Sequence, residues 1–246
     1  MKKTQKLKKI SQKRLEELSD LLSSAINAKW TDFDAKIKLF MSSSSEDEVK
    51  TMLSDKIVYS NIIEYPLSSA SHGRWRQGQI LSQLIADNYS LGDFLLENSD
   101  IDAVKTTVLE LGMYSNISLL DKVVRGEDGQ AKEIAAQWCS IKALRELKGS
   151  KSKRVQEIYY ERLGPVECLD EMLSAKYASI RAQGLARAPM NYHKLKEMTN
   201  EIARQPFSIL VRKIPFEYLP MLLANRNVAK NQWMRNQLEE RLNRGK

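Results

Sequence analysis

Residues 172–181 read MLSAKYASIR, and this stretch carries the pattern that decides the fold. An apolar helix ends in the doublet Met172-Leu173, a short polar loop follows, and a new helix opens with the apolar–basic pair Ile180-Arg181. The same order recurs where Leu95-Leu96 leads to Val104-Lys105, Val123-Val124 to Ala131-Lys132, and Leu222-Leu223 to Ala229-Lys230. Because one amphipathic hairpin cannot bury its own apolar stripe, consecutive hairpins must stack. The sequence therefore predicts a series of stacked helical hairpins.

The rest of the chain also favours helices. Gly and Pro are sparse, at 10 and 6 residues, and hardly any segment alternates apolar and polar residues with the period of a strand. Residues 15–26 place their apolar side chains on one helical face, and Ser45 with Glu48 fits a capping box at the start of another helix. The run 56–66 clusters β-branched residues, so a short strand is the alternative to a helix there. We predict an all-α chain.

The hairpin pattern resembles HEAT or armadillo-like repeats, in which the first helix ends in apolar residues and the second opens on an apolar residue and a base. The resemblance covers roughly residues 75–246 and implies an irregular α-solenoid, with an irregular helical bundle as the alternative. The last three apolar–basic pairs lie 49 residues apart and the first interval is 27, which leaves room for an extra helix at Val155–Leu163. We expect a basic, flexible tail over residues 1–14, a helical segment over 15–70 that packs on or caps the repeats, and a repeat region over 71–246.

Targeting signals and cysteine usage bear on where the chain works. No stretch approaches the roughly 20 apolar residues of a membrane-spanning helix, and the first residues lack the apolar run of a signal peptide. Cys139 and Cys168 fall on apolar helix faces without a CxxC partner, which is typical of buried thiols in a reducing compartment. We expect a cytoplasmic protein with no membrane partner.

Positive charge is unevenly distributed along the chain. The net charge is +8, of which residues 1–14 contribute +7, residues 15–140 contribute −9 and residues 141–246 contribute +10. A dense basic surface can bind a phosphate backbone through counterion release, whereas the alternative is a solvated surface. The tail is a solubilising extension, a phosphate-binding arm, or a segment that docks on the acidic residues of a neighbouring copy.

The candidate polyanion-binding residues are the bases of the tail and of the C-terminal half. They are Lys2, Lys3, Lys6, Lys8, Lys9, Lys142, Arg145, Lys148, Lys151, Lys153, Arg154, Arg181 and Arg187. The run Arg74-Trp75-Arg76 could stack a base and pair with a phosphate, although the sequence favours Trp75 as the first core residue of a helix. The other large aromatics among the bases, Trp138, Trp233, Tyr159 and Tyr160, are expected in the core, and His193 is expected to be exposed.

Catalytic motifs are not evident in the sequence. The strings GxxxxGK[ST], GxGxxG, GxSxG and HExxH are missing, and neither histidine has converging ligands nearby, so we expect no cofactor, metal or small-molecule substrate. HEAT-like DNA glycosylases are a remote alternative, for which Asp170 or Glu171 is a weak match to the required carboxylate. The leading hypothesis is a non-catalytic adaptor that binds nucleic acid or another polyanion. The alternative is a scaffold or assembly factor that binds an acidic protein partner or self-associates through its acidic and basic halves.

Overall fold

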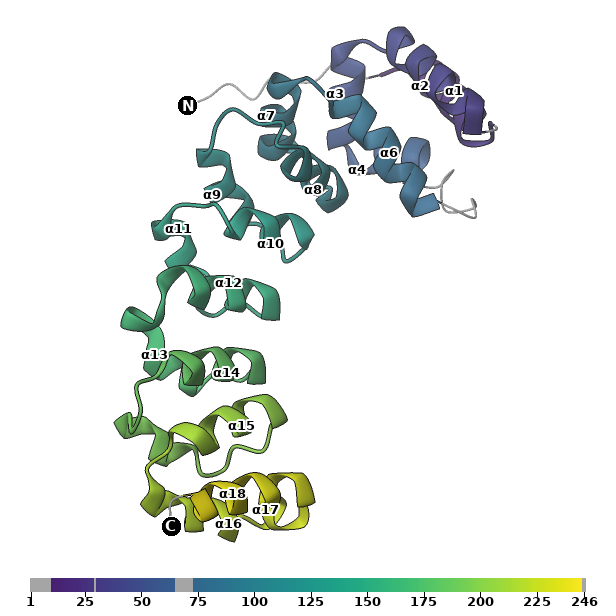
Figure 1. The fold of residues 1–246 in the computed structure, drawn as a ribbon. Coiled ribbons are helices and arrows are strands. Elements are labelled where there is room, and N and C mark those ends of the chain that lie inside the picture. Colours follow the sequence, from purple (N-terminus) through teal and green to yellow (C-terminus); the bar gives the residue numbers. More distant parts are fainter. Residues whose placement is uncertain (1–9, 29, 65–72, 245–246) are drawn as a thin grey trace. The chain divides into compact units, whose positions relative to one another are not determined.

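The computed structural model describes residues 10–28, 30–64 and 73–244 of the chain (Figure 1). Every regular element in these residues is a helix, which confirms the prediction of an all-α chain. Contacts between residues group the chain into two units, residues 1–144 and residues 145–246. The predicted division at residue 70 falls inside the first unit, where α3 (Glu46–Ser54) packs against α7 (Tyr89–Asn98). No helix in the described residues is long and apolar enough to cross a membrane.

The first unit begins with short helices and continues as hairpins. Its opening elements are α1 (Gln12–Ile26), α2 (Trp30–Ser43), α3, α4 (Lys56–Tyr59), the π-helical turn η1 (Ser60–Glu64) and α6 (Gly73–Ile85). Hairpins follow, with α7 leading to α8 (Asp102–Leu111), α9 (Ser118–Val124) to α10 (Gln130–Ala136), and α11 (Ile141–Arg145) next. Residues 56–64 are helical, so a strand there is excluded, and Pro66 lies outside the described residues.

The N-terminal helices confirm the predicted apolar face and cap. Leu18, Leu22 and Ile26 are buried where α1 packs against α2. Ser45 accepts a hydrogen bond from the Glu48 N–H while the Glu48 carboxylate accepts one from the Ser45 N–H, which completes the capping box. Helix α1 begins at Gln12, so Lys13 and Arg14 belong to this helix rather than to the basic tail.

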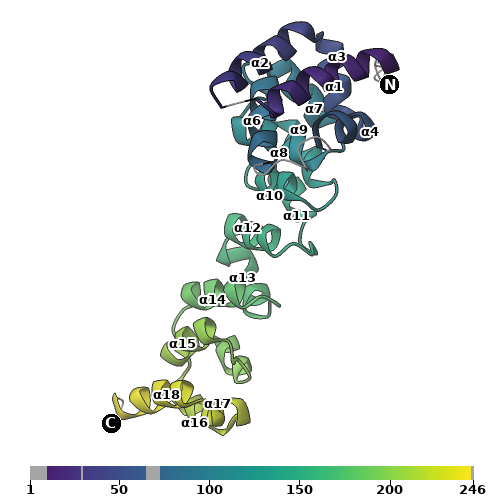
Figure 2. The ribbon, with the colours of Figure 1, turned by 90° about the vertical axis from the view of Figure 1, so that its right-hand side faces the viewer.

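The second unit contains seven α-helices and two 3-10 turns within its described residues. They are α12 (Lys153–Leu163), α13 (Pro165–Leu173), α14 (Ala178–Arg187), η2 (His193–Met198), α15 (Arg204–Lys213), η3 (Phe216–Tyr218), α16 (Leu219–Ala224), α17 (Arg226–Lys230) and α18 (Gln232–Arg244). Within this unit α12 packs on α13, α13 on α14, α14 on α15, and α15 on α18 (Figure 2). Helix α12 lies where the sequence predicts the extra helix.

The second helix of each hairpin begins at a shorter interval than the sequence pattern suggests. These helices begin at Asp102, Gln130, Lys153, Ala178, Arg204 and Gln232, 23 to 28 residues apart. The 49-residue interval between Ala131 and Ile180 therefore covers two hairpins, because α12 intervenes. The pair Ala229-Lys230 was expected to open a helix, but it ends α17, and that prediction is wrong. Membership of the HEAT-like class stays a prediction.

Close helix packing depends on two glycines. A Cβ atom on Gly184 would lie 2.9 Å from the Met172 Cβ, so α14 and α13 are in close contact at this glycine. A Cβ atom on Gly92 would lie 1.6 Å from the Met113 carbonyl oxygen. Real Cβ atoms essentially never come within 3.0 Å of such neighbours, so both positions need glycine for the observed packing. Cys139 and Cys168 are both buried, as predicted.

Candidate polyanion-binding site

The predicted basic cluster around the start of α12 is partly neutralised by carboxylates. Arg145 Nη2 lies 3.1 Å from Glu167 Oε2, and Lys148 Nζ lies 2.6 Å from Glu171 Oε1. Both of these ion pairs connect the segment before α12 to α13. Lys153 and Arg154 share Glu157, at 3.5 and 3.6 Å, while Lys142 and Lys151 are exposed. This cluster therefore presents less unbalanced positive charge than the sequence indicates.

Arg181 has a structural position. Its Nε and Nη2 donate to the two carboxylate oxygens of Glu201, and its Nη1 donates to the carbonyls of Ala175 and Lys176, both at 2.8 Å. The Glu201 side chain is only 3% exposed. The hydrogen bond to Glu201 is the main cause of a raised Arg181 pKa. Since all three guanidinium nitrogens donate hydrogen bonds within the protein, Arg181 is not available to bind phosphate. Arg187, at the end of α14, is exposed.

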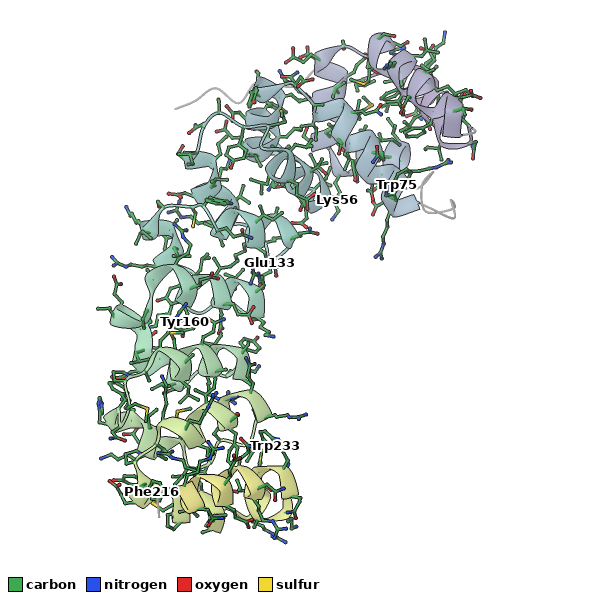
Figure 3. The ribbon with its side chains drawn as sticks, viewed as in Figure 1. Lys56, Trp75, Glu133, Tyr160, Phe216 and Trp233 are labelled. Atoms are coloured by element: carbon green, nitrogen blue, oxygen red, sulfur yellow. The ribbon has the colours of Figure 1, made fainter. Side chains whose placement is uncertain are left out.

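The aromatic residues divide between core and surface differently from the prediction. Trp75 is 50% exposed at the start of α6 (Figure 3), and Trp138 is 65% exposed, so the expectation that they lie in the core is wrong. Tyr159 and Tyr160 are buried, as predicted. Trp233 is half-buried against Phe207, with ring centroids 6.1 Å apart.

The two arginines beside Trp75 lie in different surroundings. Arg74 is exposed beside Trp75, whereas the Arg76 guanidinium lies 5.9 Å from the centre of the Phe33 ring. The structure thus uses Arg76 in packing against α2. The tail lysines Lys2, Lys3, Lys6, Lys8 and Lys9 lie outside the described residues.

Exposed bases without carboxylate partners gather later in the chain than predicted. Within residues 145–244, eight exposed bases form no ion pair with a described carboxylate, and the last six of them fall in residues 187–230; the eight are Lys151, Lys176, Arg187, Lys196, Arg204, Arg212, Arg226 and Lys230. Of this set, Lys151 and Arg187 are among the candidate ligands predicted from the sequence, and the others belong to the basic C-terminal half. The net charge of residues 145–246 is +9. The second unit therefore has its least compensated bases over residues 187–230.

A groove lies between η2 and η3, among these bases. It has a volume of about 510 Å³ and is lined by Asn191, Tyr192, His193, Lys196, Pro215, Phe216, Glu217 and Tyr218. The loop before η2 is tied to the end of α15. Asn191, which has a left-handed φ of 58°, donates its N–H to the Lys213 carbonyl at 3.2 Å, and Lys213 Nζ donates to the Ala186 carbonyl at 2.7 Å. These bonds hold the two walls of the groove together.

Hydrogen bonds and packing orient the rings of the groove. The Tyr192 hydroxyl donates to Asp170 Oδ1 at 2.9 Å, and Lys194 Nζ lies 3.0 Å from Asp170 Oδ2. The hydrogen bonds from Lys194 and then from Tyr192 lower the pKa of the Asp170 carboxyl. The His193 ring packs on Tyr192, with centroids 4.4 Å apart, and His193 is exposed as predicted.

Phe216 forms the other wall and remains accessible. It is 41% exposed and lies at an edge of the unit (Figure 3). The Arg241 guanidinium lies 5.6 Å from its ring centre, and Arg241 Nη2 donates to the Ile214 carbonyl at 2.5 Å. The partly buried base Arg241 therefore supports the Phe216 ring.

Three exposed bases lie in the groove lining or on the helices that lead into its walls. Lys196 lines the groove itself. Arg187 is the last residue of α14, just before the loop that carries Asn191, and Arg212 precedes Lys213 at the end of α15. Aromatic faces beside accessible bases suit the stacking and phosphate contacts of nucleic acid. Among the described residues, no group of three or more His, Cys, Asp or Glu side chains could hold a metal ion.

No protein family, no curated protein and no solved structure matches this chain. The groove residues Tyr192, Phe216, Tyr218 and Lys196 were not singled out from the sequence. The sequence does hold a signal for them, because all three of these aromatic residues follow within three positions of Pro189 or Pro215, and prolines mark places where helices break.

Proposed function

We propose that this chain is a non-catalytic, HEAT-like helical binding protein of the cytoplasm whose C-terminal unit binds a polyanion, with nucleic acid as the first choice. The proposal rests on the exposed basic side chains over residues 187–230 that form no ion pair with a described carboxylate. Each base that replaces a condensed counterion on a phosphate backbone gains free energy from the release of that ion. The tail lysines add to this attraction.

The proposal is tested by removing charge at two sets of bases of equal size. The first variant carries Arg187→Gln, Lys196→Gln and Arg212→Gln, and the matched control carries Arg145→Gln, Lys148→Gln and Lys153→Gln. Both lose three positive charges, but only the control residues are already paired with carboxylates. Binding of a labelled single-stranded oligonucleotide is followed by fluorescence anisotropy over a range of salt concentrations.

The first variant should weaken binding and reduce the slope of log K against log salt by about 2, since each phosphate contact on a single strand contributes about 0.7. The control should change the slope by less than half as much. Equal effects of the two variants would show that net charge matters and the site does not. An unchanged slope in the first variant would overturn the assignment of these bases.

A self-associating scaffold is the second candidate, and a feature of the first unit favours it. Tyr89, Ile117 and Ile141, at the starts of α7, α9 and α11, are 51%, 68% and 43% exposed. Asp93 accepts hydrogen bonds from the N–H groups of Ser115 and Asn116, at 2.9 and 3.2 Å, which brings the start of α9 against α7.

The next hairpin is joined in the same way. Asp121 accepts a hydrogen bond from the Ser140 N–H at 2.8 Å, beside Ile141. Asp93 and Asp121 each follow an exposed apolar residue, Tyr89 or Ile117, by four positions, and residues so spaced share a helix face. The three apolar side chains therefore lie on neighbouring helix starts. Because residues 15–140 carry a charge of −9, a basic surface, such as the second unit of another copy, complements them.

The molar mass of nuclease-treated protein, measured by light scattering at low and high salt, tests the scaffold. Self-association predicts a dimer or larger species at low salt that dissociates as salt rises, and that Ile117→Lys abolishes. A monomer at all ionic strengths would reject this second candidate and leave the polyanion proposal standing.

A further inference from the structure

We propose that the groove between η2 and η3 stacks a base of single-stranded nucleic acid, an inference that rests on the proposed function and gives it a site. The groove volume of about 510 Å³ lies within the range of roughly 300 to 1,000 Å³ that is typical of ligand pockets. Its lining combines aromatic faces with Lys196. Phe216 in this lining is 41% exposed, so its ring is accessible to a ligand.

Contacts within the protein already fix the orientation of the two aromatic rings that form the groove walls. Tyr192 is held by Asp170, and Phe216 is backed by Arg241. Since these rings are already oriented, binding a base costs little side-chain entropy, which favours affinity. Aromatic stacking accepts any base, because every base presents a π-face.

The basic residues around the groove and its one carboxylate are suited to different parts of a nucleotide. Lys196 in the lining, with Arg187 and Arg212 beside the walls, can contact the phosphates on either side of a stacked base. Glu217 also lines the groove, and its carboxylate repels phosphate. A carboxylate can instead accept a hydrogen bond from the amino group of a base, as carboxylates do from cytosine N4. The base is therefore expected to occupy the groove, with its phosphates at the rim.

This geometry selects single strands. Bases of a duplex are stacked on one another and present only their edges, so a groove that holds a ring between aromatic walls requires an unpaired base. Duplex nucleic acid can contact only the basic side chains around the groove. The groove therefore predicts a preference for single-stranded over double-stranded nucleic acid.

The test compares the full chain with Phe216→Ala and with Met221→Ala, an apolar residue outside the groove that is 53% exposed. Three labelled probes of the same length are titrated at the same salt: a thymidine oligonucleotide, a strand of abasic sites with the same backbone charge, and a duplex. Phe216→Tyr, which keeps the aromatic face, serves as the conservative variant. Circular dichroism establishes that each variant is folded.

Loss of one stacked base should weaken thymidine binding by about 5- to 150-fold in Phe216→Ala. Met221→Ala and Phe216→Tyr should stay within about two-fold of the unsubstituted chain. Abasic and duplex binding should be indifferent to Phe216→Ala, because neither probe offers a free base.

Failure of the groove inference and failure of the proposed function would give different results. If the full chain binds all three probes and Phe216→Ala weakens none or all of them equally, the groove inference is overturned while polyanion binding stands. If the full chain binds no probe even at low salt, the proposed function fails, and the groove inference fails with it.

Discussion

Replacement of Arg181 by Met should destabilise the second unit rather than merely weaken ligand binding. The guanidinium satisfies both oxygens of Glu201, whose side chain is 3% exposed, and the carbonyls of Ala175 and Lys176. Removing one partner of a buried ion pair leaves an uncompensated charge, which costs about 3–5 kcal/mol. Glu201 also accepts a hydrogen bond from the Ala203 N–H at 2.8 Å, so the start of α15 should loosen as well.

A double replacement separates the cost of the orphaned charge from the net value of the pair. Arg181→Met combined with Glu201→Leu leaves no buried carboxylate, so the double variant should be more stable than Arg181→Met alone. Arg187→Met, on an exposed base of the same helix, is the control and should change the free energy of unfolding by less than about 0.5 kcal/mol.

The free energy of unfolding is measured by urea titration of the second unit. Trp233 is the single tryptophan of residues 145–246, so its fluorescence reports this unit once Trp30, Trp75 and Trp138 are replaced by Phe. A loss of less than 1 kcal/mol in Arg181→Met, or a double variant that is less stable than the single one, would refute the reasoning.

The remaining predictions concern the core, a close contact and a pH effect. Phe207→Ala should lower the free energy of unfolding by about 3–5 kcal/mol in urea, because the side chain is fully buried. Gly92→Ala should reduce hydrogen-exchange protection in α7, because its Cβ would collide with the Met113 carbonyl, and unchanged protection would contradict the packing. Hydrogen bonding to Arg14 is the main cause of a Glu48 pKa of about 2, below its usual 4.5. Stability from this pair is therefore present above pH 4.5 and declines as pH falls toward 2; Arg14→Ala should flatten that decline in the acid unfolding curve.

Local features of the fold could be predicted from the sequence. The capping box at Ser45 depends on residues three positions apart, and the helix at Val155–Leu163 follows from the room that the 49-residue interval between Ala131 and Ile180 leaves. The run 56–64 became helical because packing against neighbouring helices outweighs a weak β-propensity.

The surface was harder to predict, because exposure depends on what covers a helix. Helical spacing assigned Trp75 and Trp138 to an apolar face, but no neighbouring element covers them fully. Ion pairs were equally hard to predict, because their partners are far apart in the sequence. Lys148 meets Glu171, and Arg181 meets Glu201, across 23 and 20 residues, so the sequence could not distinguish paired from free bases. The groove escaped notice because its two walls come from loops that only the fold brings together.

Titration of the full chain with a labelled single-stranded oligonucleotide at about 0.15 M salt tests the central claim most directly. The protein is first treated with nuclease and freed of bound nucleic acid. We predict saturable binding whose log K falls linearly with log salt, as expected when exposed bases contact phosphates. No saturable binding at this salt or at ten-fold lower salt would contradict the claim that the second unit binds a polyanion.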